Sequence, residues 1–161
     1  MRINFYDTRI SDDDRTILVK EKGVNYQEGK MNNPQVIAEM MQKLLHMDTL
    51  AEEYCYMIAL NSANKPLGLF FISKGTVSAS LVSPRELFIR ALLAGAVSVV
   101  LCHNHPSGNV LPSDADLKLT NQIKEAGKLI GIGLLDHIII SGSGYFSFRE
   151  SDLLKKDGDA V

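Results

Sequence analysis

The chain has 161 residues, of which 45% are hydrophobic and 22% are charged, with a net charge of −2. These values are ordinary for one globular domain with a real core. The slightly acidic balance gives no electrostatic footprint for nucleic acid. No apolar run approaches the length of a membrane span, and the acidic N-terminus has no apolar segment typical of a signal peptide.

The two cysteines, Cys55 and Cys102, lie in apolar segments with the character of strands. This placement is typical of buried thiols in a reducing compartment, so we expect a cytoplasmic protein without disulfides. Cys102 precedes His103 and could be proposed as a metal ligand. Alternation along a strand argues against this role, because it would point Cys102 to the opposite face.

The first thirty residues are polar, and only Thr16 to Val19 predicts a short strand. Apolar residues at helical spacing then predict a helix from Asn33 to about His46. Asn33 is a plausible N-cap, and Pro34 suits the first helical position.

The rest of the chain alternates strands and helices. We expect strands at 54–60, 67–72, 97–101, 134–140 and 145–148, a short extended piece at 78–81, and helices at 84–94 and 114–126. Gly127 is a natural terminator for the second of these helices. Paired strands mixed with helices predict an α/β fold, a mixed β-sheet flanked by helices.

A pair of histidines follows the apolar run from Ala96 to Cys102, and this run predicts a buried strand. His103 and His105 therefore sit at the C-terminal end of a strand, where α/β sheets tend to place functional groups. Ser113 and Asp116 come next, at the start of the predicted helix. Two imidazoles and a carboxylate that leave one position open are typical of a catalytic zinc site.

The same residues also have a structural interpretation. Ser113 and Asp116 could form an N-cap and an acidic N3 residue, close to a capping box. Asp114 competes with Asp116 for the ligand role, since carboxylates are favoured in the first turn of any helix. His137 could support a ligand from outside the site, although a purely structural hydrogen bond is the simpler interpretation. Asn104, between the two histidines, is expected to point away from the ion and brace the loop.

The spacing His103-x-His105, seven residues, Ser113, two residues, Asp116 resembles the signature of JAB/MPN (JAMM) metalloproteases. The stretch from His103 to Thr120 resembles the RadC branch of that superfamily, and Leu135-Asp136-His137 agrees with it. The resemblance implies an MPN/JAB domain, related to the cytidine-deaminase-like fold. We assign residues 48–155 to a RadC-type JAB/MPN domain and residues 1–47 to an N-terminal extension with one helix.

The resemblance also implies an activity, the zinc-dependent hydrolysis of peptide or isopeptide amide bonds. His103, His105 and Asp116 would hold Zn²⁺, and Ser113 would donate to the oxyanion of the tetrahedral intermediate. The family also needs an upstream glutamate as general base. Glu52 and Glu53 are both candidates, and the alignment with the RadC pattern favours Glu53.

A DNA-repair-associated or DNA-binding module without proteolytic activity is the alternative, in keeping with the historical label of RadC proteins. Such proteins often carry a helix-hairpin-helix segment before this domain, and too few residues precede Asp48 here for one. The net charge does not support nucleic-acid binding either. The tripeptide His-Asn-His is not the nuclease element of that name, and the signature of zinc deaminases is missing. We therefore expect a peptide or protein substrate and no membrane association.

Overall fold

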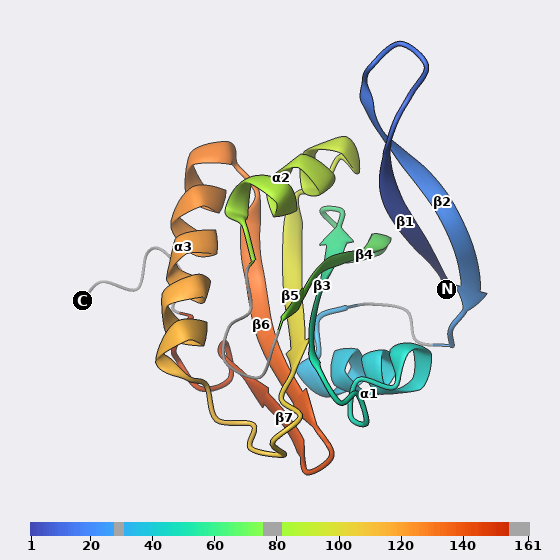
Figure 1. Ribbon diagram of the computed structural model, residues 1–161. Coiled ribbons are helices and arrows are strands. Elements are labelled where there is room, and N and C mark those ends of the chain that lie inside the picture. The colour runs from blue at the N-terminus through green and yellow to red at the C-terminus, as the bar shows by residue number, and fades with distance from the viewer. Residues whose placement is uncertain (28–30, 76–81, 155–161) are drawn as a thin grey trace.

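The computed structural model describes residues 1–27, 31–75 and 82–154. The elements in these ranges are β1 (Arg2–Ile10), β2 (Thr16–Asn25), α1 (Pro34–Leu45), β3 (Glu53–Leu60), β4 (Pro66–Gly75), α2 (Pro84–Leu93), β5 (Ser98–Asn104), α3 (Asp114–Ile130), β6 (Gly133–Ser141) and β7 (Gly144–Ser147). The strands form one sheet in the order β2-β1-β4-β3-β5-β6-β7 (Figure 1). The pairs β1–β4 and β5–β6 are parallel and the others antiparallel, which confirms the predicted mixed sheet.

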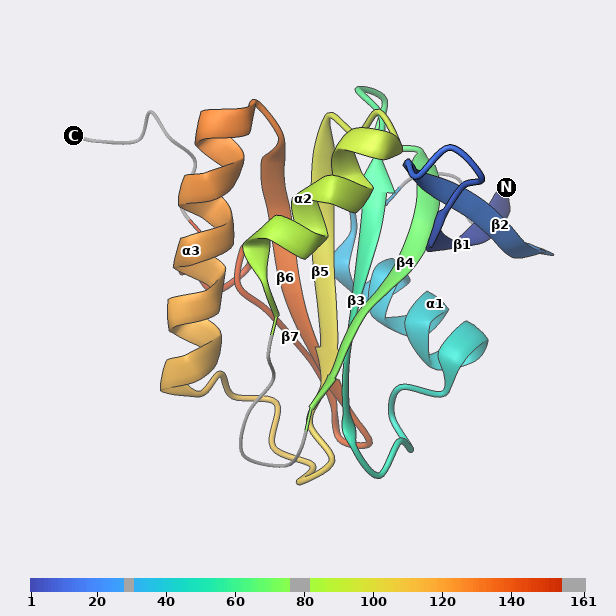
Figure 2. The same cartoon turned by 45° about the horizontal axis from the view of Figure 1, so that its top comes forward.

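Helices cover both faces of this sheet, with α1 on one side and α2 and α3 on the other (Figure 2). The sheet therefore separates two apolar clusters. Ile37 and Met41 of α1 pack in the first cluster, while Leu87 of α2 and Ile123 of α3 pack in the second. Because β5 is buried on both faces, its side chains are apolar almost without interruption until the histidines.

The predicted helix start at Asn33 is confirmed, because its side chain accepts hydrogen bonds from the first turn of α1. The predicted end of α3 at Gly127 is wrong. The helix continues to Ile130, and Gly131 ends it in the left-handed conformation, with φ of 80°. Gly127 serves close packing instead, since a Cβ there would lie 2.3 Å from the carbonyl oxygen of Ile132.

The N-terminal residues contain far more strand than the expected segment 16–19. β1 and β2 form a long antiparallel hairpin, and β1 joins the sheet through Phe5 and Tyr6, which pair in parallel with Leu69 and Phe70 of β4. Residues 1–47 thus contribute two strands to the sheet as well as the predicted helix. The extended piece expected at 78–81 lies outside the described residues.

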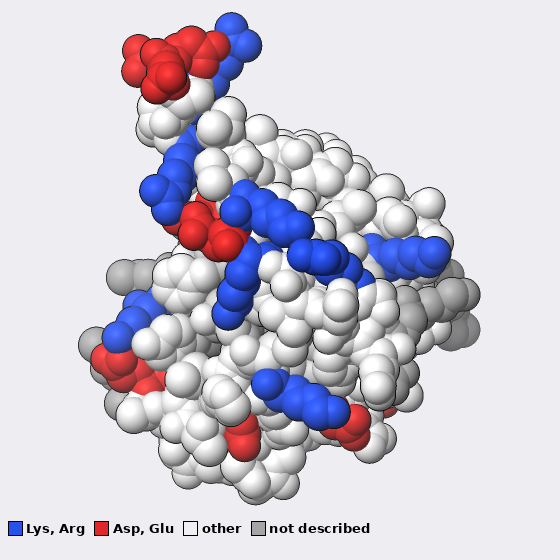
Figure 3. All heavy atoms as spheres, turned by 90° about the vertical axis from the view of Figure 1, so that its right-hand side faces the viewer, with Lys and Arg blue, Asp and Glu red and all other residues white. Residues whose placement is uncertain are grey.

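The hairpin projects beyond the body of the molecule, and its turn carries three consecutive aspartates, residues 12–14 (Figure 3). On the face that this view presents, several lysine and arginine side chains form a band across the middle, and acidic side chains lie beside part of this band and at the hairpin turn. Arg9, for example, forms an ion pair with Glu21 on the neighbouring strand at 3.0 Å. Among the described residues, no helix is both long and apolar enough to cross a membrane.

Candidate metal centre

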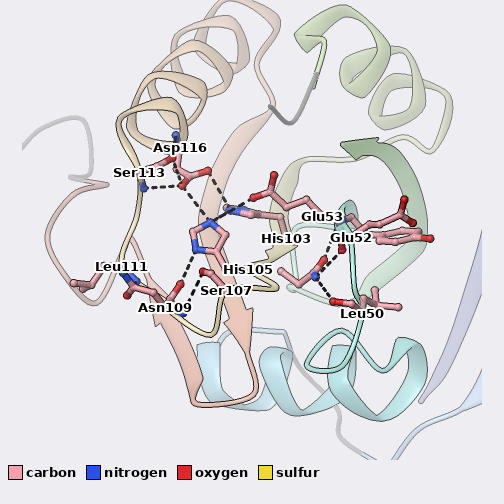
Figure 4. A network of polar contacts seen from close by, with 12 residues as sticks. Leu50, Glu52, Glu53, His103, His105, Ser107, Asn109, Leu111, Ser113 and Asp116 are labelled. Atoms are coloured by element: carbon pink, nitrogen blue, oxygen red, sulfur yellow. Dashed lines mark hydrogen bonds and ion pairs between the residues drawn. The ribbon is translucent and has the colours of Figure 1, made fainter. Parts of the chain in front are cut away.

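Strand β5 carries His103 into the interior and places His105 just beyond its end. β5 lies between β3 and β6, and His103 is only 2% exposed. Because alternate residues of an extended chain point to the same side, both rings lie on the face of the sheet that α3 covers. Their Nε2 atoms approach to 3.0 Å (Figure 4).

The first turn of α3 brings a carboxylate to the two rings. Asp116 Oδ1 lies 3.1 Å from His103 Nε2, and Asp116 Oδ2 lies 3.4 Å from His105 Nε2. Oδ2 also accepts hydrogen bonds from the Ser113 hydroxyl at 2.6 Å and from the Ser113 backbone N–H at 2.7 Å. Ser113 is the N-cap and Asp116 completes a capping box, so the anticipated helix cap and the contact with both histidines occur together. Asp114, the competing carboxylate, is exposed.

Glu53, at the start of β3, approaches the same point from another strand. β3 and β5 are antiparallel with Cys55 opposite His103. Two residues further along this register, Glu53 comes level with His105 on the same face of the sheet. Its Oε1 lies 3.6 Å from His105 Nε2.

The neighbouring glutamate is engaged elsewhere. Glu52 forms an ion pair with Lys74 of β4 at 2.5 Å. Of the two glutamates that the sequence left open, Glu53 is therefore the one that faces the histidines. Strand alternation places the side chain of Asn104 on the face opposite His103, as expected, but it bonds to the backbone at the start of β3 rather than to the loop after β5.

The side chains thus converge from β3, β5 and α3. Ligand atoms of Glu53, His103 and His105 all lie within 4.8 Å of one another, close enough to hold one metal ion. Asp116 also contacts both histidines. The structure therefore brings together all five residues singled out from the sequence, with Ser113 held on Asp116, and Glu53 lies near enough to be a ligand as well as the base that the resemblance suggested.

Hydrogen bonds to the other ring nitrogens decide which atoms face the centre. His105 Nδ1 lies 2.7 Å from the carbonyl oxygen of Asn109. A carbonyl only accepts, so Nδ1 carries the proton and the lone pair of a neutral His105 is on Nε2. His103 Nδ1 lies 2.8 Å from His137 Nε2, which likewise leaves His103 Nε2 directed at the centre.

This donor set fits a divalent cation. Two neutral imidazole nitrogens would direct lone pairs at each other and at carboxylate oxygens, an arrangement that is repulsive until a proton or a metal ion lies between them. Two imidazoles with one or two carboxylates are typical ligands of Zn²⁺. Asp116 is oriented by Ser113 and His105 by Asn109, as ligands of metal sites usually are.

The ionisable groups respond to burial and to one another. Burial raises the pKa of Glu53, although the nearby histidines oppose this shift. Burial would also raise the pKa of Asp116, but its contacts with His103, His105 and Ser113 hold it well below its usual range. The hydrogen bond to Asp116 raises the pKa of His105. Burial lowers the pKa of His137 well below that of an exposed histidine, which keeps this ring neutral.

A model of the RadC-like JAB domain matches residues 31–153, most of the chain. The chain belongs to the RadC-like JAB domain family. The strand-loop-helix segment that carries His103, His105, Ser113 and Asp116 lies inside the matched range, and so does Glu53. The fold is accordingly the α/β fold of a JAB/MPN-type domain, as the resemblance implied.

Curated relatives of this RadC-like JAB domain carry the name UPF0758 protein. The one from Clostridium tetani (strain Massachusetts / E88) is 41% identical over 134 residues, which cover 83% of this chain and 57% of the relative. The one from Rubrobacter xylanophilus is 50% identical over 105 residues, which cover 65% of this chain and 46% of the relative. The chain thus spans about half the length of these relatives.

Two residues near the site were missed or undervalued in the sequence. Thr120 was not singled out, yet its hydroxyl contacts His137 at 2.7 Å and donates to the backbone carbonyl of Asp116 at 2.6 Å. Its spacing gave a usable signal, since a threonine four residues after Asp116 lies on the same helix face and can bond that carbonyl. His137 was recognised, but its direct contact with His103 depends on the parallel pairing of β5 and β6, which no local pattern reveals.

Proposed function

We propose that this chain is a zinc-dependent hydrolase of amide bonds, acting on peptide or isopeptide bonds of a protein substrate. The observation that carries the proposal is the convergence of two imidazole Nε2 atoms and two carboxylates from three separate elements of the fold. Membership of the RadC-like JAB domain family supports it. His103, His105 and Asp116 are the proposed zinc ligands.

A bound zinc ion would supply Lewis acidity, which lowers the pKa of water to about 7. Side chains of the protein carry out the proton transfers and hold the ligand geometry. Glu53 takes the proton of the attacking water and delivers it to the leaving amine nitrogen. Its pKa, raised by burial, suits a group that must both accept and release a proton. Asp116, whose pKa is held low, stays ionised as a ligand.

Ser113 is the proposed donor to the oxyanion that forms at the carbonyl carbon. Its hydroxyl donates to Asp116 Oδ2 at 2.6 Å. Donation to an oxyanion therefore requires the Ser113 hydroxyl to turn from Asp116 toward the substrate. The backbone N–H of Ser113 also bonds Oδ2, so Asp116 keeps one partner while the hydroxyl is engaged.

The decisive experiment compares two neighbouring glutamates. Zinc-loaded protein is incubated with a proteome-derived peptide library in ¹⁸O-water, and new ¹⁸O-labelled carboxyl termini are identified by mass spectrometry. We expect Glu53→Gln to retain zinc but lose cleavage, while Glu52→Gln retains both because Glu52 pairs with Lys74. Cleavage that survives in Glu53→Gln, or stoichiometric zinc that survives in the double variant His103→Ala/His105→Ala, would contradict the proposal.

We also infer a reducing, cytoplasmic location. The free thiols of Cys55 and Cys102 are both buried, and burial raises the pKa of each well above its usual range. Such thiols are inert packing groups and suit a compartment in which disulfides do not form.

A further inference from the structure

His137 is a fully buried histidine outside the proposed ligand set. It lies on β6, with an exposed fraction of 0%, and its ring stacks on Phe148 with centroids 4.7 Å apart. Both ring nitrogens have partners, namely His103 Nδ1 at 2.8 Å and Thr120 Oγ1 at 2.7 Å. Stacking alone would not require this pair of polar contacts, so His137 links a candidate metal ligand to a hydroxyl on α3.

The direction of each hydrogen bond in the series from Asp116 through Thr120 and His137 to His103 is fixed by the first bond. The Thr120 hydroxyl donates to the carbonyl oxygen of Asp116 at 2.6 Å, and a carbonyl can only accept. Thr120 Oγ1 is then the acceptor for His137 Nδ1–H. Burial disfavours a charged imidazole and the proton of His137 is on Nδ1, so its Nε2 carries a lone pair and accepts from His103 Nδ1–H. His103 Nε2 is thereby left to face the candidate metal centre.

We propose that Thr120 and His137 are positioning residues that fix His103 in the ring form able to bind the metal through Nε2. The proposal rests on the metal site of the proposed function, not on the substrate. The contrast with His105 shows why two residues are needed. His105 Nδ1 meets a backbone carbonyl directly, which sets its proton without help. His103 meets another imidazole, whose nitrogens can either donate or accept.

Without the Thr120 acceptor, His137 could carry its proton on Nε2 instead. That proton would point at His103 Nδ1 and force the proton of a neutral His103 onto Nε2, where it would block the metal. The hydroxyl of Thr120 therefore acts on zinc binding through two hydrogen bonds and without touching the site. This series of hydrogen bonds also ends at a proposed ligand, because the carbonyl that orients Thr120 belongs to Asp116.

The test uses a matched pair of variants, Thr120→Val, which removes the hydroxyl at nearly constant shape, and Thr120→Ser, which keeps it. The first readout is the protonation of the two His137 ring nitrogens, from long-range ¹H–¹⁵N spectra of the zinc-free protein. The second is zinc affinity from competition with a chelator. We expect the proton on His137 Nδ1 in the wild type and in Thr120→Ser. In Thr120→Val we expect it on Nε2, with zinc bound about 10–100-fold more weakly.

Two outcomes would overturn the proposal. One is a proton on His137 Nε2 in the wild-type protein, a result that needs no variant to fold. The other is a Thr120→Val protein that has lost thermal stability but keeps the wild-type ring form and zinc affinity, as a merely structural hydroxyl would predict. Neither readout depends on turnover. Failure to find an amide substrate would therefore leave the inference standing, and its own failure would leave hydrolysis open.

Discussion

The side-chain amide of Asn104 holds the backbone on both sides of Glu53. Its Nδ2 donates to the carbonyl oxygen of Glu52 at 2.9 Å, and its Oδ1 accepts from the N–H of Tyr54 at 2.8 Å. Asn104 lies between the two histidines in the sequence, so one residue of β5 fixes the start of β3 at the level of the site. The segment that presents Glu53 is thus tied directly to the segment that presents the proposed ligands.

We expect Asn104→Ala to lower the free energy of unfolding by about 1–3 kcal/mol, because it leaves backbone groups of Glu52 and Tyr54 without their partner. Amide hydrogen exchange of Tyr54 should accelerate, and urea unfolding measures the loss of stability. The exposed Asn109 is the control, since Asn109→Ala keeps the backbone carbonyl that His105 uses. Equal protection of the Tyr54 amide in the Asn104→Ala and wild-type proteins would show that the hydrogen bonds of Asn104 to this backbone are dispensable.

Removal of zinc should destabilise the folded protein. We expect about one zinc ion per chain, as a site with one set of ligands implies. At free zinc 1,000-fold above the dissociation constant, binding adds about 4 kcal/mol of stability, so an excess of chelator should lower Tm markedly. Metal analysis and thermal unfolding with and without chelator measure both effects. In the His103→Ala/His105→Ala variant the chelator should leave Tm unchanged, and a shift of wild-type size there would place the zinc elsewhere.

Most of the fold on the C-terminal side of Asn33 could be predicted because its signals are local. The buried run before His103, the cap at Ser113 and the Pro34 start of α1 each depend on a few adjacent residues. The approach of Glu53 to His105 could not be derived this way, since it depends on the antiparallel register of β3 with β5. The resemblance to a family supplied Glu53 where local pattern reasoning could not.

The N-terminal hairpin shows where local signals fail. β1 and β2 carry many polar side chains because much of the hairpin is exposed, so the apolar alternation that marks a strand is weak. Ile3 and Phe5 are buried in the same apolar cluster as Ile37 and Met41 of α1, which are remote in sequence. The prediction that Gly127 ends α3 was wrong for a related reason. Its lack of a side chain is required by Ile132, and no helical pattern distinguishes such a glycine from one that ends the helix.

Ser113 should contribute to stability whatever its part in chemistry. Its hydroxyl caps α3 and donates to Asp116. We expect Ser113→Ala to cost about 0.5–2 kcal/mol, the usual effect of losing an N-cap. Ser113→Thr should restore most of this, and Ser107→Ala in the exposed part of the same loop should change stability by less than about 0.5 kcal/mol. Urea unfolding of the three variants checks the order, and equal losses in Ser113→Ala and Ser107→Ala would contradict it.

The zinc-free protein should show a pH-dependent ion pair between His105 and Asp116. The hydrogen bond to Asp116 raises the pKa of His105 above 6.5, and that of Asp116 is held below 3.8. The pair therefore stabilises the folded state between pH 3.8 and pH 6.5, the ordinary pKa values of the two groups. It loses this contribution as the pH rises through the raised pKa of His105. Urea unfolding in chelator should show a larger stability difference between wild type and His105→Gln at pH 5.5 than at pH 8.5. We expect about 1 kcal/mol or less, since the pair is only partly buried. A larger difference at pH 8.5 would reverse the sign and reject the pair.

Binding to DNA should be weak near physiological salt. The net charge is −2, and although Figure 3 shows several basic side chains on the hairpin face, some are paired with acidic ones, as Arg9 is with Glu21. A protein that neutralises several phosphates shows an affinity that falls steeply with salt, and this requires uncompensated lysines and arginines. Gel-shift titrations with duplex and single-stranded DNA at two salt concentrations measure this directly. Tight binding that falls steeply with salt and is the same in Glu53→Gln would favour a DNA-associated module over the hydrolase.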